Sequence, residues 1–444
     1  MQLVKYKSRP LDAWKKAKEL RHNHYMDVMT AKEKGKLLVE GGTEGLISLP
    51  AGLGEDYVYF GGEPYGATIA ADPKFSLECQ EATESRNFAR DMCSYMRNYW
   101  GSMFLDKTPF GTKFPKPDFC FQLHICDSHA KWYQFVSEYY GVPYFAIEAP
   151  PITVKNGVLD LGNFDKRVDY MTDEMMACID WMQKITGRKY NDDLFRKAVT
   201  NECLSTRTWA AVCSLQKNIP APLDQKTMFS LYIISVLVRF RDESREFYEM
   251  LLDEVKDRVA NKIAALPTER KRILDDSQPP WYFLKLYRQM EEYGAVTIGS
   301  HYSFLLAGAF SEQPDGTWGP SQTPAERGMP MKTRRDICKA LATWYCERPV
   351  FEGLLMPMYR NQQIVRLAKE WKADAVLLHY NRGCEGLTQT IPEQRLALQK
   401  EGLVVGTYEG NMGDSRELDE AQVLDRIDAL METLGLNKIP ADAK

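Results

Sequence analysis

An apolar run, a cysteine, a helical stretch and a second apolar run follow one another within residues 119–149. The runs at 119–125 and 143–149 have the composition of strands, the stretch 130–140 has helical periodicity, and Cys126 directly follows the first run. Short connections through a helix join parallel strands, because the helix returns the chain to the same end of the sheet. The segment therefore predicts a β–α–β unit with Cys126 at the carboxyl end of its first strand.

The same order recurs near the end of the chain. Strands are predicted at 373–379 and 403–408, a helix at about 392–400, and Cys384 lies in the intervening loop 381–386. Open parallel sheets bind ligands outside the carboxyl ends of their strands. Both cysteines are therefore candidate ligands, although a small buried hydrophobic side chain is the more common role of a free cysteine.

The rest of the chain places these units in a larger protein, because 444 residues exceed what one hydrophobic core usually organises. Helical periodicity dominates residues 10–34, 80–99 and 165–265, and a further strand is predicted at 295–300. Gly and Pro recur in residues 41–64, which are predicted to be rich in loops. We predict an α/β fold with two parallel-sheet, flavodoxin- or Rossmann-like halves, a helical N-terminal arm and a helical insertion between the halves. The predicted domains are the arm at residues 1–60, a first α/β domain containing the insertion at 61–265, and a second α/β domain at 266–444.

Composition argues against several classes of partner. The formal net charge of −4 provides no general basic field for nucleic acid. The longest apolar run, residues 229–238, is about half as long as a membrane-spanning helix, and the N-terminal residues have no apolar secretory region. We therefore expect a cytoplasmic protein that binds neither nucleic acid nor membrane.

The standard local motifs for nucleotides and metals do not occur in the sequence. There is no phosphate-binding G-x-x-x-x-G-K-[S/T] loop and no G-x-G-x-x-G after a predicted strand, so we expect no ATP hydrolysis by this chain. The ten cysteines include no C-x-x-C pair, so a metal site would have to be assembled from distant segments. Thiolates suit iron–sulfur centres, but the residues alone leave open whether any of the ten is a ligand.

Three cysteine-containing segments carry a family resemblance: residues 91–101 (DMCSYMRNYWG), 124–127 (HICD) and 381–386 (NRGCEG). Together they resemble the three-cysteine pattern of the superfamily of 2-hydroxyacyl-CoA dehydratases and benzoyl-CoA reductases. Supporting similarities lie at 185–194 (ITGRKYNDDL) and 220–223 (PAPL). The C-terminal stretch 384–414 looks specifically like the benzoyl-CoA reductase branch.

The resemblance implies a cofactor and partners. Cys93, Cys126 and Cys384 match the three thiolates that hold an oxygen-sensitive [4Fe–4S] cluster in that superfamily, which leaves one iron for a ligand other than cysteine. It also implies a homologous cluster-bearing subunit, separate ATP-hydrolysing activator subunits, ferredoxin as the upstream electron donor, and an aromatic acyl-CoA substrate. The missing phosphate loop agrees with ATP hydrolysis on another subunit.

The function implied first is that of an oxidoreductase subunit. In this hypothesis the chain belongs to an ATP-driven aromatic acyl-CoA reductase, which reduces benzoyl-CoA or a close analogue to a cyclic dienoyl-CoA by single-electron steps. One alternative is a subunit of a 2-hydroxyacyl-CoA dehydratase, which uses the same cluster to remove water. Another is an electron-relay subunit without a substrate site of its own.

Three residues outside the cysteines are candidates for contact with the substrate. Glu148, His301 and Glu409 lie at or just after the carboxyl ends of predicted strands, where ligands of parallel sheets bind. We predict that His301 donates a proton, because the pKa of histidine suits proton transfer near neutral pH. Glu148 and Glu409 are predicted to line the substrate cleft.

Overall fold

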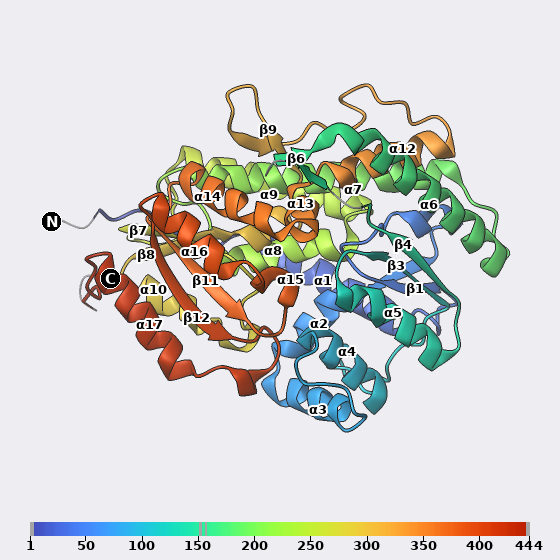
Figure 1. Ribbon diagram of the computed structural model, residues 1–444, viewed down its shortest axis with the longest axis horizontal. Helices are drawn as coiled ribbons and strands as arrows, with labels where there is room; N and C mark the ends of the chain where they lie inside the picture. Colours follow the sequence, from blue (N-terminus) through green and yellow to red (C-terminus); the bar gives the residue numbers. More distant parts are fainter. Residues whose placement is uncertain (1–3, 151–152, 156–157, 441–444) are drawn as a thin grey trace.

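Two four-stranded parallel sheets, one from each half of the chain, form the framework of the computed structural model (Figure 1). The structure describes residues 4–150, 153–155 and 158–440. The first sheet has the order β2-β1-β3-β4, with β1 Leu37–Gly41, β2 Tyr57–Gly61, β3 Phe119–His124 and β4 Tyr144–Glu148. The second has the order β12-β11-β7-β8, with β7 Lys271–Asp275, β8 Ala295–Ser300, β11 Ala375–Asn381 and β12 Val404–Gly410.

Helices cover both sheets and connect them. The N-terminal helices are α1 Ala13–Met29, α2 Gly62–Ala70, α3 Pro73–Glu84, α4 Ser94–Leu105 and α5 Asp127–Tyr140. The central helices are α6 Phe164–Thr186, α7 Asp192–Ser214, α8 Gln225–Val238 and α9 Asp242–Ala260. The C-terminal helices are α10 Lys285–Glu291, α11 His301–Leu305, α12 Arg334–Cys346, α13 Pro349–Leu355, α14 Arg360–Glu370, α15 Glu385–Thr388, α16 Ile391–Lys400 and α17 Glu420–Thr433.

Smaller elements complete the chain. Two antiparallel hairpins pair β5 Thr153–Lys155 with β6 Val158–Asp160 and β9 Phe310–Glu312 with β10 Trp318–Pro320. The short 3₁₀ helices are η1 Leu49–Leu53, η2 Leu161–Asn163, η3 Leu215–Lys217, η4 Trp281–Phe283, η5 Pro357–Tyr359 and η6 Ser415–Glu417.

The predicted α/β architecture is confirmed. The strands predicted around Cys126 are β3 and β4, those around Cys384 are β11 and β12, and the strand predicted at 295–300 is β8 of the same later sheet. The predicted helical insertion consists of α6 to α9. Its most apolar member, α8, packs against β2 of the first sheet and β8 of the second. A helix that is apolar on every side is buried, so the long apolar run belongs to the core between the halves.

One local prediction was incomplete and another was wrong. Residues 41–64 are rich in loops as predicted, but the prediction missed β2, which lies among them and, with β1, forms half of the first sheet. These strands are short and buried on both faces, so they lack the alternation that marks a strand. A helix was predicted through residues 80–99, but α3 ends at Glu84 and Asn87 is left-handed, with φ 65°. Cys93 therefore precedes a helix instead of lying inside one.

None of the helices within the described ranges is long and apolar enough to cross a membrane.

The packing of α4 on α3 gives a first prediction. A Cβ added at Gly101 of α4 would lie 2.0 Å from the carbonyl oxygen of Cys79 in α3, and backbone cannot move aside as a flexible side chain can. Gly101→Ala should therefore lower the free energy of unfolding by about 3 kcal/mol or more, as measured by urea denaturation. Gly386→Ala is the control, because its added Cβ would meet nothing within 4 Å. Equal stability of the two variants would contradict this packing.

Candidate functional site

A cavity of about 410 Å³ lies where the two halves meet, and all three cysteines of the predicted ligand set line it. Cys126 follows β3 of the first sheet, and Cys384 lies shortly beyond β11 of the second. Cys93 comes from the segment between α3 and α4. Helix α8 supplies further lining residues from between the sheets. The carboxyl ends of both sheets therefore contribute to one cavity, as expected for ligand sites in parallel sheets.

Each of the three cysteines occupies the residue directly before a helix: Cys93 before α4, Cys126 before α5 and Cys384 before α15. All three are partly exposed, whereas the other seven cysteines of the chain are buried. Burial raises the pKa of the Cys93 thiol, and negative charge on Cys384 and Cys126 raises it further. The direction of this shift is that of like charges near one another, as expected for thiols on one cavity.

Cys126 has a charged partner on the first turn of α5. The Sγ of Cys126 lies 3.3 Å from Nδ1 of His129, whose Nε2 contacts Oε1 of Glu63. Burial alone would lower the pKa of His129, but the charges of Cys126 and Glu63 raise it well above its usual value. Burial raises the pKa of Cys126, but His129 outweighs it, and the net shift is downward. The arrangement therefore favours a thiolate at Cys126.

Cys384 is held by polar groups of the second half. Nε2 of Gln278 donates to the Sγ of Cys384 at 3.7 Å, and Nδ2 of Asn381 donates to Oε1 of Gln278 at 3.2 Å. The backbone N–H of Ser94, the first residue of α4, donates to the carbonyl oxygen of Gly383 at 3.3 Å. This last bond ties the Cys93 segment directly to the Cys384 loop.

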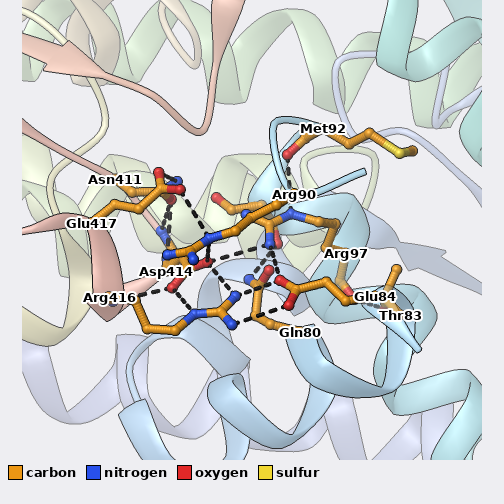
Figure 2. Close-up of polar contacts among 12 residues, drawn as sticks. Gln80, Thr83, Glu84, Arg90, Met92, Arg97, Asn411, Asp414, Arg416 and Glu417 are labelled. Atoms are coloured by element: carbon orange, nitrogen blue, oxygen red, sulfur yellow. Dashed lines mark hydrogen bonds and ion pairs between the residues drawn. The ribbon is translucent and has the colours of Figure 1, made fainter. Parts of the chain in front are cut away.

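A buried ion-pair network lies beside this contact and joins the two halves (Figure 2). Arg97 of α4 is fully buried; its Nη1 lies 3.3 Å from Oδ2 of Asp414, which follows β12. Its Nε donates to the carbonyl oxygen of Met92 at 3.1 Å, next to Cys93. Arg416 donates to Oδ1 of Asp414 at 2.9 Å and also contacts Glu84 of α3. The network thus connects the Cys93 segment to the loop that follows the last strand of the second sheet.

The three thiols are donors of the type that iron–sulfur clusters take. No group of three or more histidine, cysteine, aspartate or glutamate side chains converges on one ion position in the described part of the chain. Each thiolate of a [4Fe–4S] cluster binds a different iron, so its three sulfurs need not converge on one point. Three partly exposed thiols on one cavity meet this requirement.

His301 lies where the sequence predicts it, at the start of α11 and on the cavity lining. It is buried, and its Nε2 lies 2.9 Å from Oε1 of Gln363. An amide oxygen only accepts, so this bond places a hydrogen on Nε2. Burial and the charge of Arg360 lower the pKa of His301 to about 3. The imidazole is therefore neutral at physiological pH, and a proton that it donates has to come from the uncharged ring.

Glu148 and Glu409 are not among the residues that line the cavity. Oε1 of Glu148 lies 2.6 Å from Nδ1 of His124 at the edge of the first sheet, and Oε2 of Glu409 accepts from Nη2 of Arg382 at 2.8 Å. Both carboxylates are exposed. Both glutamates lie at the carboxyl end of a strand, where ligands of parallel sheets bind. Side chains of successive strand residues point to opposite faces of the sheet, however. A position at the strand end therefore does not determine whether the side chain faces the cavity.

Sequence reasoning missed three polar residues of the site: Glu63, His129 and Gln278. His129 stands three residues after Cys126 at the start of a predicted helix, a spacing that brings side chains together and is visible in the sequence. Glu63 and Gln278 come from other segments, next to β2 and β7, and only the folded arrangement brings them to the cysteines.

The fold and the site define a two-sheet α/β protein with three cysteines at a shared cavity. The family described as 2-hydroxyglutaryl-CoA dehydratase, D-component, matches residues 60–434, and this chain belongs to that family. The predicted superfamily is thereby confirmed.

Three individual relatives share 24–26% identity with this chain. The (R)-2-hydroxyglutaryl-CoA dehydratase subunit alpha of Acidaminococcus fermentans is 26% identical over 327 residues, which cover 73% of this chain but only 61% of that protein. The (R)-phenyllactyl-CoA dehydratase alpha subunit of Clostridium sporogenes is 24% identical over 440 residues, covering 96% and 99%. The (R)-2-hydroxyisocaproyl-CoA dehydratase alpha subunit of Clostridioides difficile is 25% identical over 378 residues, covering 84% of each. These names favour the dehydratase alternative over the aromatic reductase that the sequence suggested first.

The buried network in Figure 2 gives a second prediction. Asp414→Asn would remove the buried counter-charge of Arg97 and leave it with the partly exposed Glu84, whose Oε1 lies 3.1 Å from Nη1 of Arg97. Loss of the buried partner should lower the free energy of unfolding by about 3 kcal/mol in urea denaturation. The control is Glu420→Gln, which removes an exposed ion pair with Lys285 and should cost less than about 1 kcal/mol. A similar loss in both variants would contradict a special role for the buried pair.

Proposed function

We propose that this chain is the [4Fe–4S]-binding subunit of a 2-hydroxyacyl-CoA dehydratase, in which Cys93, Cys126 and Cys384 hold the cluster. The observation that carries the proposal is that these three thiols line one cavity, although they come from three distant segments. Membership of the 2-hydroxyglutaryl-CoA dehydratase family supports the reaction class, which removes water from a 2-hydroxyacyl thioester to leave the unsaturated thioester.

A bound cluster would supply single electrons to the thioester. The residues of this chain hold the cluster and shield the reaction. His129 and Gln278 place N–H groups beside the sulfurs of Cys126 and Cys384, where they stabilise negative charge. Buried aromatic residues such as Trp132 line the same cavity and exclude water from it. The size of the cavity favours a substrate site in this chain over a role limited to electron relay.

The proposal includes the partners that such a reaction needs. A homologous cluster-bearing subunit would complete the enzyme, since the relatives are named as alpha subunits. A separate ATP-hydrolysing activator that receives electrons from ferredoxin would drive the low-potential electron transfer. The absence of a phosphate-binding loop from the sequence supports ATP hydrolysis on another subunit.

Iron content tests the ligand assignment. Anaerobically purified protein should contain about four irons and four inorganic sulfides per chain, and Ser in place of Cys93, Cys126 or Cys384 should abolish or destabilise the cluster. Cys178→Ser and Cys346→Ser are matched controls, because both thiols are buried and neither lines the cavity. Full iron content in all three ligand variants would refute the assignment.

Turnover tests the reaction class. The complete enzyme should dehydrate a 2-hydroxyacyl-CoA in the presence of the activator and a low-potential reductant. Reduction of benzoyl-CoA without any dehydration would instead establish the aromatic reductase.

We also propose that His301 contacts the substrate at this cavity as an uncharged hydrogen-bonding group, because its lowered pKa rules out the proton donor that the sequence suggested. His301→Ala should leave the iron content unchanged and slow turnover by about tenfold, the scale for the loss of one hydrogen bond. The control is His379→Ala, which removes another buried histidine that does not line the cavity. Unchanged turnover of the His301 variant would show that His301 has only a structural role, as the hydrogen-bond partner of Gln363.

A further inference from the structure

One wall of the cavity is built from uncharged side chains. Its residues come from α8, from α11 with the residue that follows it, and from α13. None of these elements carries a predicted cluster ligand. We call this set the apolar wall; it consists of Tyr232, Val236, Tyr302, Leu306, Val350 and Leu354. The hydroxyl groups of Tyr232 and Tyr302 bond to each other at 3.0 Å, so the polar ends of these two rings are satisfied within the wall.

The apolar wall lies near the cysteines. Tyr95, which directly follows the Cys93-Ser94 pair, also lines the cavity. Nε1 of Trp281 donates to the hydroxyl of Tyr95, and the Trp281 ring packs against Phe229 of α8, whose ring in turn contacts Tyr232 of the wall. An acyl chain in contact with the wall would therefore keep its thioester near the cysteines.

Two buried arginines beside the cavity already face a carboxyl group. Arg360, which lines the cavity, contacts Asp276 at 2.6 Å, and Arg239 contacts Glu202 at 2.8 Å. His129 is likewise balanced by Glu63 and Cys126. The one lysine of the lining, Lys131, is exposed.

A terminal carboxylate placed against the apolar wall would lose water. Glu44 also lies on the cavity lining and is 5% exposed, and its carboxyl oxygens have no hydrogen-bond partner in the described parts of the chain. Burial raises the pKa of Glu44 to about 7, so it carries only part of a negative charge near neutral pH. The cost of a terminal carboxylate at this wall is therefore chiefly the cost of removing it from water.

We propose that the cavity selects a thioester whose acyl chain is an uncharged hydrocarbon, branched or aromatic, and rejects acyl chains that end in a carboxylate. The hydrocarbon packs on the apolar wall, and each additional buried carbon adds to affinity. This inference rests on the proposed function, which supplies the thioester and the 2-hydroxyl group of the substrate. It adds the kind of acyl chain that the site accepts.

Binding measurements on the iron-loaded, anaerobically purified protein test the selection. Calorimetry should give a Kd for (R)-2-hydroxyisocaproyl-CoA and (R)-phenyllactyl-CoA at least about tenfold lower than for lactoyl-CoA, because each buried CH₂ contributes to affinity. (R)-2-hydroxyglutaryl-CoA should bind more weakly than either of the first two. Equal or tighter binding of the glutaryl or lactoyl thioester would overturn the proposal.

A matched pair of variants locates the selection at the apolar wall. Leu354→Trp fills space at the wall and should weaken binding of the isocaproyl thioester by about tenfold, with little effect on lactoyl-CoA. Leu355→Trp is the control, because Leu355 is the next residue of α13, is also partly exposed and does not line the cavity. Iron content confirms that both variants keep the cluster. Equal effects of the two substitutions, or an unchanged Kd with Leu354→Trp, would refute the assignment of the wall.

The same measurements separate this inference from the proposed function. Preference for 2-hydroxyglutaryl-CoA would overturn the inference and leave the dehydratase function standing. Binding of benzoyl-CoA but of no 2-hydroxyacyl-CoA, with loss of affinity in Leu354→Trp, would refute the dehydratase function and support the selection of an uncharged acyl chain. Failure of all these thioesters to bind would overturn both.

Discussion

The buried ion pair between Arg97 and Asp414 connects the two halves of this protein at the point where the site depends on their relative position. Arg97 belongs to the helix that begins directly after Cys93, and Asp414 follows the last strand of the sheet that carries Cys384. Three thiols from distant segments can serve one cofactor only if these halves are held in a fixed arrangement. A buried charge pair is a directional contact, because displacement of either partner leaves an uncompensated charge in the interior.

The electrostatics of the cavity follow from the same arrangement. Burial raises the pKa of the Cys93 thiol, whereas the neighbouring His129 lowers that of Cys126. His129 in turn depends on Glu63, which comes from the start of α2 in the first half. The thiols thus differ in how readily they form thiolates before any metal is bound, with Cys126 the most favoured. The apolar wall around Tyr232 and Leu354 lines the same cavity and offers a place for hydrocarbon.

Much of this fold could be predicted from sequence because its strands near Cys126 and Cys384 are apolar runs separated by clear helical stretches. The short strands β1 and β2 could not, because both of their faces are buried and the alternation that marks a strand is missing. The three cysteines were proposed as ligands through a family resemblance, since composition and spacing alone favoured a packing role for each of them. His301 lines the cavity, whereas Glu148 and Glu409 do not, because position at a strand end does not determine which face the side chain occupies.

The central claim is that one cavity of this chain holds both a four-iron cluster and the acyl thioester. Mössbauer spectroscopy of protein loaded with ⁵⁷Fe, recorded with and without (R)-2-hydroxyisocaproyl-CoA, tests it most directly. Three cysteine ligands leave one iron with a different ligand, so addition of the thioester should change the signal of about one iron in four and leave the others unaltered. A spectrum without a four-iron cluster, or a cluster signal that the thioester does not change, would contradict the account.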